Sequence, residues 1–241
     1  MRGLGTIINV AAIIAGGVLG ALFGKKLKER YRETMVAAVG ICTMFLGGAG
    51  ALTKMLVFED GSIGSQGTMM MVVTYALGAL VGEWIDIDRQ FERFGTWLRH
   101  KTGNDRDTGF VDAFVTASLT VCIGAMAIVG AIEDGIYGNY SILAAKAVLD
   151  LLIILIMTAS MGKGCAFSAI PVGIVQGIFT LLAVALRPIF TDAALANLSM
   201  VGNIMIFCVG LNLVFGKKIR VANLLPTLVF AVIWAFIPWL K

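Results

Sequence analysis

Two opposite charges stand one helical turn apart in a segment that is otherwise almost entirely apolar. In SILAAKAVLDLLIILIMTAS, residues 141–160, Lys146 precedes Asp150 by four positions. That spacing places both side chains on one face of a helix. A carboxylate beside an ammonium group can bind and release a proton or a cation, or it can merely neutralise its partner. Which of these applies depends on the medium around the segment.

The composition identifies that medium. The chain has 241 residues, of which 59% are hydrophobic and 14% are charged, whereas a soluble domain carries about 25% charged residues. So few charges cannot cover a water-facing surface, and we expect most of the surface to face lipid. The sequence therefore predicts a single integral membrane domain over residues 1–241, with the lipid bilayer as a partner and no nucleic acid.

Eight apolar runs are long enough to cross a bilayer as helices, which takes about 20 residues each. They cover residues 3–24, 35–57, 68–84, 109–131, 142–160, 165–186, 195–215 and 223–240. The runs do not alternate polar and apolar residues, as membrane strands would. The predicted fold is therefore an all-α polytopic transmembrane bundle of about eight spans.

The basic residues are spread unevenly over the segments that connect these runs. Most of the 19 lysines and arginines follow the first, third, fifth and seventh runs. Cytoplasmic loops carry an excess of such residues. This pattern predicts a multi-pass membrane protein with both termini outside.

The longest connecting segment, residues 84–108, has a helical pattern of its own. Phe91, Phe94 and Trp97 recur at helical spacing, with basic residues between them. Such a pattern is typical of an amphipathic helix at a membrane surface. We therefore expect a helix on the cytoplasmic side, which could also bind a partner.

Short similar blocks recur along the chain at nearly equal offsets. LGALVGEW at 77–84 resembles LNLVFGKK at 211–218, and VGI occurs at 39–41 and at 172–174. The offsets favour two four-helix repeats, residues 1–135 and 136–241, as in many transporters. The alternative is that small residues recur only because they allow close helix packing. Either interpretation favours a tight bundle, and we expect a homodimer.

Asp150 lies too deep to reach the membrane surface. At a rise of about 1.5 Å per residue from Ile142, it lies roughly 12 Å into the apolar core. Intramembrane ionisable groups usually face a bundle interior or a water-filled path. Other polar side chains in or at the ends of the runs could line the same path. These are Asn9, Asp112, Glu133, Asp134, Gln176, Asn203 and Asn212.

Two of these assignments have plain structural alternatives. Asp112 opens a predicted span, where a carboxylate also stabilises the first turn of a helix. The Lys146–Asp150 pair could serve only to satisfy its own charges. The pair is nevertheless an inefficient stabiliser, because buried ion pairs contribute little compared with well-packed apolar residues. The sequence therefore favours a functional interpretation of Asp150.

Several long blocks resemble a known family. They are GTIINVAAIIAGGVLGALFG at 5–24, VCIGAMAIVGAIEDG at 121–135, ILAAKAVLD at 142–150 and VGNIMIFCVGLNL at 201–213. They are similar to the bacterial YqgA-type family of integral membrane proteins, which is catalogued as a domain of unknown function, family 554. The similarity covers nearly the whole chain, and the block at 123–135 is its most specific part. The resemblance implies a multi-span inner-membrane protein with an assumed role in transport, and it supplies no substrate and no catalytic residues.

These observations lead to three function classes. We favour a secondary transporter of a small solute or ion, coupled to protons or cations through Asp150, with Lys146 as its partner. The alternative is a non-transporting membrane scaffold or regulator that acts through residues 84–108. An enzyme is disfavoured, because the sequence shows no nucleophile–base pair and no metal motif. We expect no cofactor, no metal and no catalytic residues.

Overall fold

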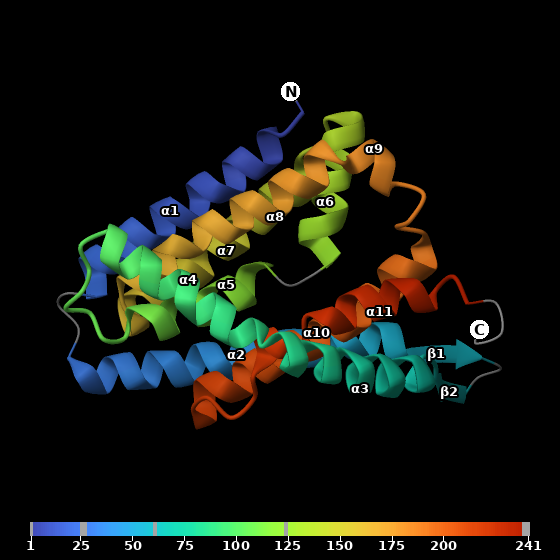
Figure 1. Ribbon diagram of the computed structural model, residues 1–241, viewed down its shortest axis with the longest axis horizontal. Coiled ribbons are helices and arrows are strands. Elements are labelled where there is room, and N and C mark those ends of the chain that lie inside the picture. The colour runs from blue at the N-terminus through green and yellow to red at the C-terminus, as the bar shows by residue number, and fades with distance from the viewer. Residues whose placement is uncertain (1, 25–27, 60–61, 123–124, 238–241) are drawn as a thin grey trace.

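The computed structural model describes residues 2–24, 28–59, 62–122 and 125–237 of the chain (Figure 1). Its α-helices are α1 (Leu4–Gly24), α2 (Glu29–Met55), α3 (Thr68–Ile85), α4 (Ile87–Lys101), α5 (Phe110–Cys122), α6 (Ala125–Tyr137), α7 (Ser141–Met161), α8 (Ala169–Leu181), α9 (Ala183–Leu186), α10 (Asp192–Phe215) and α11 (Pro226–Trp234). Two 3₁₀ helices, η1 (Lys163–Ser168) and η2 (Val221–Leu224), precede α8 and α11. Strands β1 (Leu56–Glu59) and β2 (Ser62–Ser65) form an antiparallel hairpin at the end of α2.

The predicted all-α membrane bundle is confirmed. Six helical stretches within the described residues are long and apolar enough to cross a membrane, namely α1, α2, α3, α7, η1 with α8, and α10. Helices α5 and α6 make a seventh only as one broken span, because they bend by 61° relative to each other. The last predicted run, 223–240, overlaps the shorter apolar stretch Val221–Trp234, and its residues 238–240 lie outside the described ones. The count of eight spans therefore stays a prediction.

Glycines bring α1 and α7 into direct backbone contact. Gly16 packs against Leu151, Gly20 against Leu155 and Gly24 against Ala159, so the two helices run in the same direction. A Cβ atom on Gly24 would lie 2.7 Å from the Ala159 carbonyl oxygen, which no side chain could accept. Small residues allow this close approach in membrane bundles. The parallel direction agrees with the odd position that both helices hold in the predicted order of spans.

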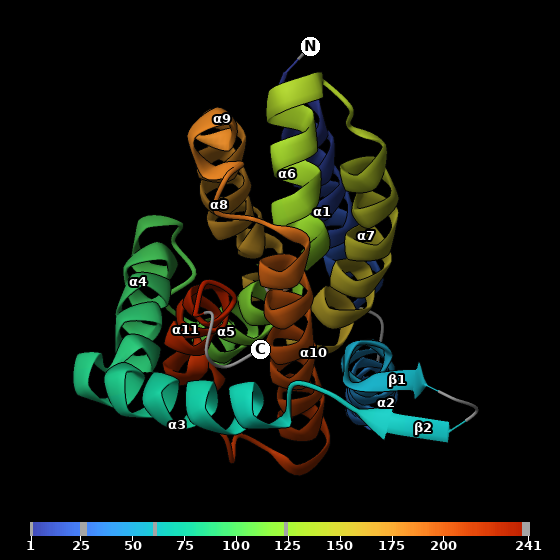
Figure 2. The same ribbon diagram turned by 90° about the vertical axis from the view of Figure 1, so that its right-hand side faces the viewer.

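A second close pair, α2 and α10, is antiparallel. Gly40 lies against Gly210 and Leu213, whereas Gly50 lies against Asn203. Figure 1 shows the pair α2–α10 in the lower half of the molecule and α1 and α7 in the upper half, with α2 also packed against α7. Helices α3 and α11 flank α10 (Figure 2), and α5 lies between the two halves. The predicted division into repeats 1–135 and 136–241 stays a prediction.

The amphipathic helix expected in 84–108 is α4, and much of its apolar side faces protein. The rings of Phe94 and Phe114 lie 5.8 Å apart, and Gly95 allows α5 to approach closely. Leu98 is buried in the same cluster, whereas Trp97 is exposed. Contact of α4 with a membrane surface stays a prediction.

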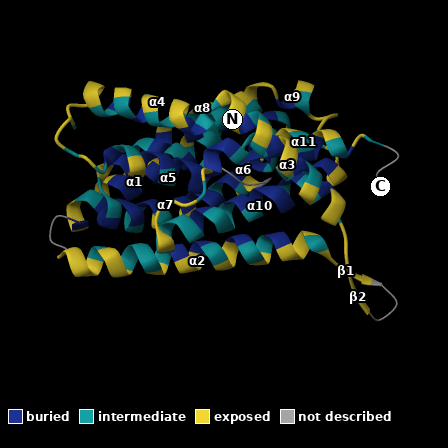
Figure 3. Ribbon diagram, turned by 60° about the horizontal axis from the view of Figure 1, so that its bottom comes forward, coloured by how far each residue is buried: buried dark blue, intermediate teal, exposed yellow. Residues whose placement is uncertain are grey.

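Burial identifies the centre of the bundle. Figure 3 shows buried residues concentrated in the inner helices, with the exposed residues on the outward sides of α2 and α4. In α5 the apolar residues Phe110, Phe114 and Val121 are almost fully buried. Helix α5 is therefore the central element of the bundle, and its end determines the geometry described next.

Candidate functional site

Lys146 and Asp150 form an ion pair inside the bundle. The Lys146 Nζ lies 2.5 Å from Asp150 Oδ2, across one turn of α7. Both residues are buried, with 7% and 3% of their surface exposed. The spacing of four residues predicted this contact, and the structure places it on the side of α7 that faces other helices.

The Lys146 ammonium has a second partner on another helix. It donates a hydrogen bond of 2.9 Å to the carbonyl oxygen of Val121, one residue before α5 ends at Cys122. In a continuous helix that carbonyl would accept from the N–H group four residues later. Because the chain bends here by 61°, the last carbonyls of α5 need other partners. Lys146 therefore joins α7 to the end of a broken helix.

Two unsatisfied amides lie at the same level. Asn9 of α1 is fully buried beside the Asp150 carboxylate, outside hydrogen-bond geometry. Gln176 of α8 is also buried. Neither amide group has a hydrogen-bond partner among the described residues. Buried polar groups are normally satisfied by protein, water or an ion, so this level of the bundle is suited to bind water or a small ion.

A strip of polar side chains runs from these amides to one end of the molecule. The hydroxyl oxygens of Thr6 and Thr180 lie 3.3 Å apart, one turn from Asn9 on α1 and from Gln176 on α8. Both threonines line a cavity of about 410 Å³, together with Arg2. Residues three or four apart share a helix face. The hydroxyls and the amides therefore form one continuous polar strip between α1 and α8.

Asp134, at the same end, has a structural contact. Its Oδ2 accepts a hydrogen bond of 2.8 Å from the backbone N–H of Gly5, in the first turn of α1. A carboxylate at this position satisfies a free donor and complements the helix dipole. Asp134 Oδ1 has no partner within the described chain. Glu133, its neighbour on α6, is half-buried.

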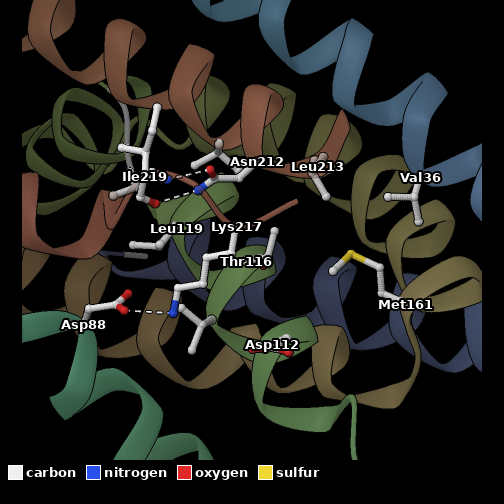
Figure 4. A pocket seen from close by; sticks show the side chains of 13 residues that line it. Val36, Asp88, Asp112, Thr116, Leu119, Met161, Asn212, Leu213, Lys217 and Ile219 are labelled. Atoms are coloured by element: carbon white, nitrogen blue, oxygen red, sulfur yellow. Dashed lines mark hydrogen bonds and ion pairs between the residues drawn. The ribbon is translucent and has the colours of Figure 1, made fainter. Parts of the chain in front are cut away.

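At the opposite end lies a second cavity of about 190 Å³, whose mainly apolar lining includes the charged residues Asp88, Asp112 and Lys217 (Figure 4). Asp112, an exposed residue in the first turn of α5, lines this cavity. Lys217 Nζ lies 2.8 Å from Asp88 Oδ2 and 2.6 Å from Glu92 Oε1. Partial burial lowers the pKa of Lys217, but its hydrogen bonds to Asp88 and Glu92 raise the pKa above its ordinary value overall. These ion pairs hold α4 to the segment that follows α10.

Comparison with known proteins gives the family. The sequence profile of the family described as "Protein of unknown function (DUF554)" matches residues 4–236. This chain belongs to the DUF554 family. The resemblance found in the sequence is therefore confirmed.

Two relatives of this DUF554 protein match it almost end to end. The chain is 29% identical over 233 residues to the "Uncharacterized membrane protein YdfK" of Bacillus subtilis (strain 168), covering 97% of this chain and 96% of the relative. It is 29% identical over 232 residues to the "Uncharacterized protein YqgA" of Escherichia coli (strain K12), covering 95% and 94%. No solved structure matches the chain. The relatives and the apolar helices together make the DUF554 protein a helical membrane protein.

Asn203 and Asn212, the two predicted site residues on α10, are engaged by nearby backbone. Asn203 Nδ2 donates to the Ser199 carbonyl at 2.8 Å. Asn212 Nδ2 donates to the Ile219 carbonyl at 2.7 Å, and Asn212 Oδ1 accepts from the Lys218 and Ile219 N–H groups. Asn212 thus closes the loop after α10 beside the second cavity. These contacts give both amides a local structural role.

The structure of the DUF554 protein therefore divides the predicted site residues into groups. Asn9, Lys146, Asp150 and Gln176 converge at one level of the bundle, whereas Asp134 and the α10 asparagines make structural contacts. Sequence reasoning missed the Val121 carbonyl, because a backbone group has no side-chain signature. It also missed Thr6 and Thr180, whose spacing from Asn9 and Gln176 could have indicated a shared helix face.

Proposed function

We propose that this DUF554 protein is a secondary transporter of a small solute or ion in the bacterial inner membrane. Asp150 would be the group that binds the coupling proton or cation, with Lys146 as its counter-charge. The observation that supports this is the hydrogen bond from the Lys146 ammonium to the Val121 carbonyl at the end of α5. Broken helices that hold charged groups near the middle of the membrane are typical of secondary transporters.

The geometry suggests how coupling would work. A proton or cation on Asp150 removes the negative charge that holds the ammonium, so Lys146 can turn toward its second partner on α5. The pair on α7 and the end of α5 would then shift relative to each other. Asn9 and Gln176, with their free amide groups, would supply ligands for water or an ion during this step.

The proposal also covers the orientation of the protein in the membrane and its assembly. Both termini would lie outside, Asp112 and the Lys217 ion pairs would face the cytoplasm, and two copies would form a homodimer. The protein would have no catalytic activity of its own. The scaffold alternative has weaker support, because Phe91, Phe94 and Leu98 of α4 already pack in the protein core, although Trp97 is exposed.

A substrate-independent experiment tests the proposed path. Asn9→Cys and Gln176→Cys are made separately and exposed in membranes to a small water-soluble methanethiosulfonate reagent. If the polar strip is a hydrated path, both cysteines react. Native Cys165, which is fully buried among apolar residues, serves as the control for a dry core and stays unreacted. Cysteines at both positions that are as inert as Cys165 would contradict the transport proposal.

A further inference from the structure

A large apolar cavity lies next to the ion pair, on the other side of the end of α5. It has a volume of about 450 Å³ and is lined by α4, α5, α6, α8, α10 and α11, including Phe179, Leu198 and Leu228. Ligand pockets usually have volumes of about 300–1,000 Å³ and mainly apolar walls. The size and lining are those of a binding site for a molecule with a substantial hydrocarbon body.

Two polar side chains stand together in one wall of this cavity, which is otherwise apolar. Ser118 and Cys122 line it from successive turns of α5, so their side chains share a helix face. Ser118 is fully buried, and its Oγ has no hydrogen-bond partner in the described part of the chain. An unsatisfied buried hydroxyl carries an energetic penalty, which a hydrogen bond to a ligand in the cavity would remove.

Of the two charges of the Lys146–Asp150 pair, the ammonium is the one that contacts the end of α5 behind this wall. The carbonyl of Val121, next to Cys122 in sequence, already accepts the hydrogen bond from Lys146 Nζ. A cationic head group at this wall would meet the ammonium, and like charges in a medium of low dielectric repel strongly. An anionic head group would be attracted to Lys146 and could accept a hydrogen bond from Ser118. The wall therefore favours an acid over a base or a neutral alcohol.

We propose that this cavity binds an amphipathic carboxylic acid, with its hydrocarbon body among Phe179, Leu198 and Leu228 and its carboxylate at Ser118 and Cys122. The claim that this acid is the transported substrate rests on the proposed function, whereas the claim that the cavity binds the acid does not. A bound carboxylate would attract the Lys146 ammonium across the end of α5 and so draw it away from Asp150. Asp150, left without its counter-charge in a buried position, would then bind a proton, because an isolated buried charge is neutralised rather than tolerated. The acid and a proton would thus move together.

Photo-crosslinking of the full-length protein in phospholipid nanodiscs tests the site. The probe is decanoic acid that carries a diazirine in its chain, and the matched probe is the corresponding decanol. We expect the acid to label cavity residues several-fold more than the alcohol does, with loss of the signal when unlabelled decanoate is added. Equal labelling by both probes would overturn the proposal. So would adducts confined to exposed, lipid-facing residues such as Phe45 and Leu80.

Two variants locate the head group. Ser118→Ala should lower cavity labelling by the acid several-fold, whereas Ser168→Ala should leave it unchanged, because Ser168 is equally buried and unpartnered but lies outside the cavity. The double variant Lys146→Met with Asp150→Leu should reduce labelling by the acid to the level of the alcohol. Thermal unfolding in the same nanodiscs confirms that each variant is folded. Unchanged labelling in both Ser118→Ala and the double variant would overturn the assignment of the carboxylate.

The two proposals fail in different ways. If the acid labels the cavity but the cysteines at Asn9 and Gln176 stay inert, the binding site stands and the transport proposal fails. If those cysteines react but the acid labels the cavity no better than the alcohol, the path stands and the substrate class is wrong.

Discussion

Lys146 Nζ on α7 donates a hydrogen bond of 2.9 Å to the carbonyl oxygen of Val121 on α5, next to the bend of 61° between α5 and α6. The bond joins a side-chain charge to the negative end of a helix dipole. It explains why the ammonium is tolerated so deep in the bundle, since both of its neighbours are negative. It also means that a change in the charge of Asp150 affects the connection between two helices.

The first prediction separates the stability of the ion pair from its function. Asp150→Leu leaves Lys146 as an uncompensated buried charge, so we expect a loss of about 3–5 kcal/mol in the free energy of unfolding. Lys146→Leu with Asp150→Leu should restore stability to near that of the unaltered protein. Thermal unfolding of the purified variants measures both effects.

The same variants test the role of Asp150. Transport coupled through Asp150 requires that the stable double variant be inactive. Asp150→Asn should fold and be inactive as well, because a neutral amide is cheaper to bury than a lone carboxylate. Asp134→Asn is the matched control, because the amide oxygen can still accept from Gly5 and activity should persist. Solute-driven uptake into proteoliposomes measures the activity of each variant. An active double variant would show that the pair has only a structural role.

The second prediction concerns the contact between α1 and α7. A Cβ atom on Gly16 would collide with the backbone carbonyl of Leu151, which cannot move without displacing α7. Gly16→Ala should therefore lower the melting temperature. Gly177→Ala is the matched control, because nothing lies within 4 Å of its added Cβ atom. Since alanine favours helix by about 1 kcal/mol over glycine, this control should be neutral or stabilising.

The third prediction concerns the contact between α6 and the start of α1. Asp134→Ala removes the acceptor for the Gly5 N–H group, so we expect a loss of about 0.5–2 kcal/mol, as for other helix caps. Asp134→Asn should lose less, because it keeps an acceptor oxygen. Denaturation of both variants in one detergent compares them directly, and equal losses would show that charge, not the acceptor, matters here.

The fourth prediction concerns the Lys217 ion pairs and pH. The pKa of Lys217 is raised above its ordinary value of 10.5 by its bonds to Asp88 and Glu92, which outweigh the opposing effect of burial. A raised pKa means that the stabilisation is fully present below 10.5 and is lost as pH rises through the folded-state value. Lys217→Met should therefore lower the melting temperature equally at neutral and mildly alkaline pH, because it leaves the buried Asp88 carboxylate without its counter-charge. A difference that vanishes well below pH 10.5 would contradict this account.

The fifth prediction concerns orientation in the membrane. Single cysteines at Ser65 and Tyr137, in a background without native cysteines, should react with an impermeant thiol reagent in intact cells. A cysteine at Arg106 should react only after lysis, because the basic segments are expected inside. All three positions are exposed, so access rather than burial decides the outcome. Labelling at Arg106 in intact cells would reverse the orientation.

The sequence by itself determined the class of protein and the charge pair. Low charge and long apolar runs require a membrane-embedded helical bundle, and a spacing of four residues is enough to bring Lys146 and Asp150 together on any helix. Both conclusions depend on local composition and helical period, which fold context does not alter. The glycine faces of α1 and α2 were also visible as small residues suited to close packing.

Only the tertiary structure decided what surrounds the pair. Asn9 and Gln176 reach the level of the pair because of the register between α1, α7 and α8. Asn203 and Asn212 are equally polar in the sequence, but they form hydrogen bonds with nearby backbone carbonyls. The Val121 carbonyl became a partner because α5 breaks at that point. Contacts of this kind join segments far apart in the chain, and they depend on packing and register, which no local pattern of residues records.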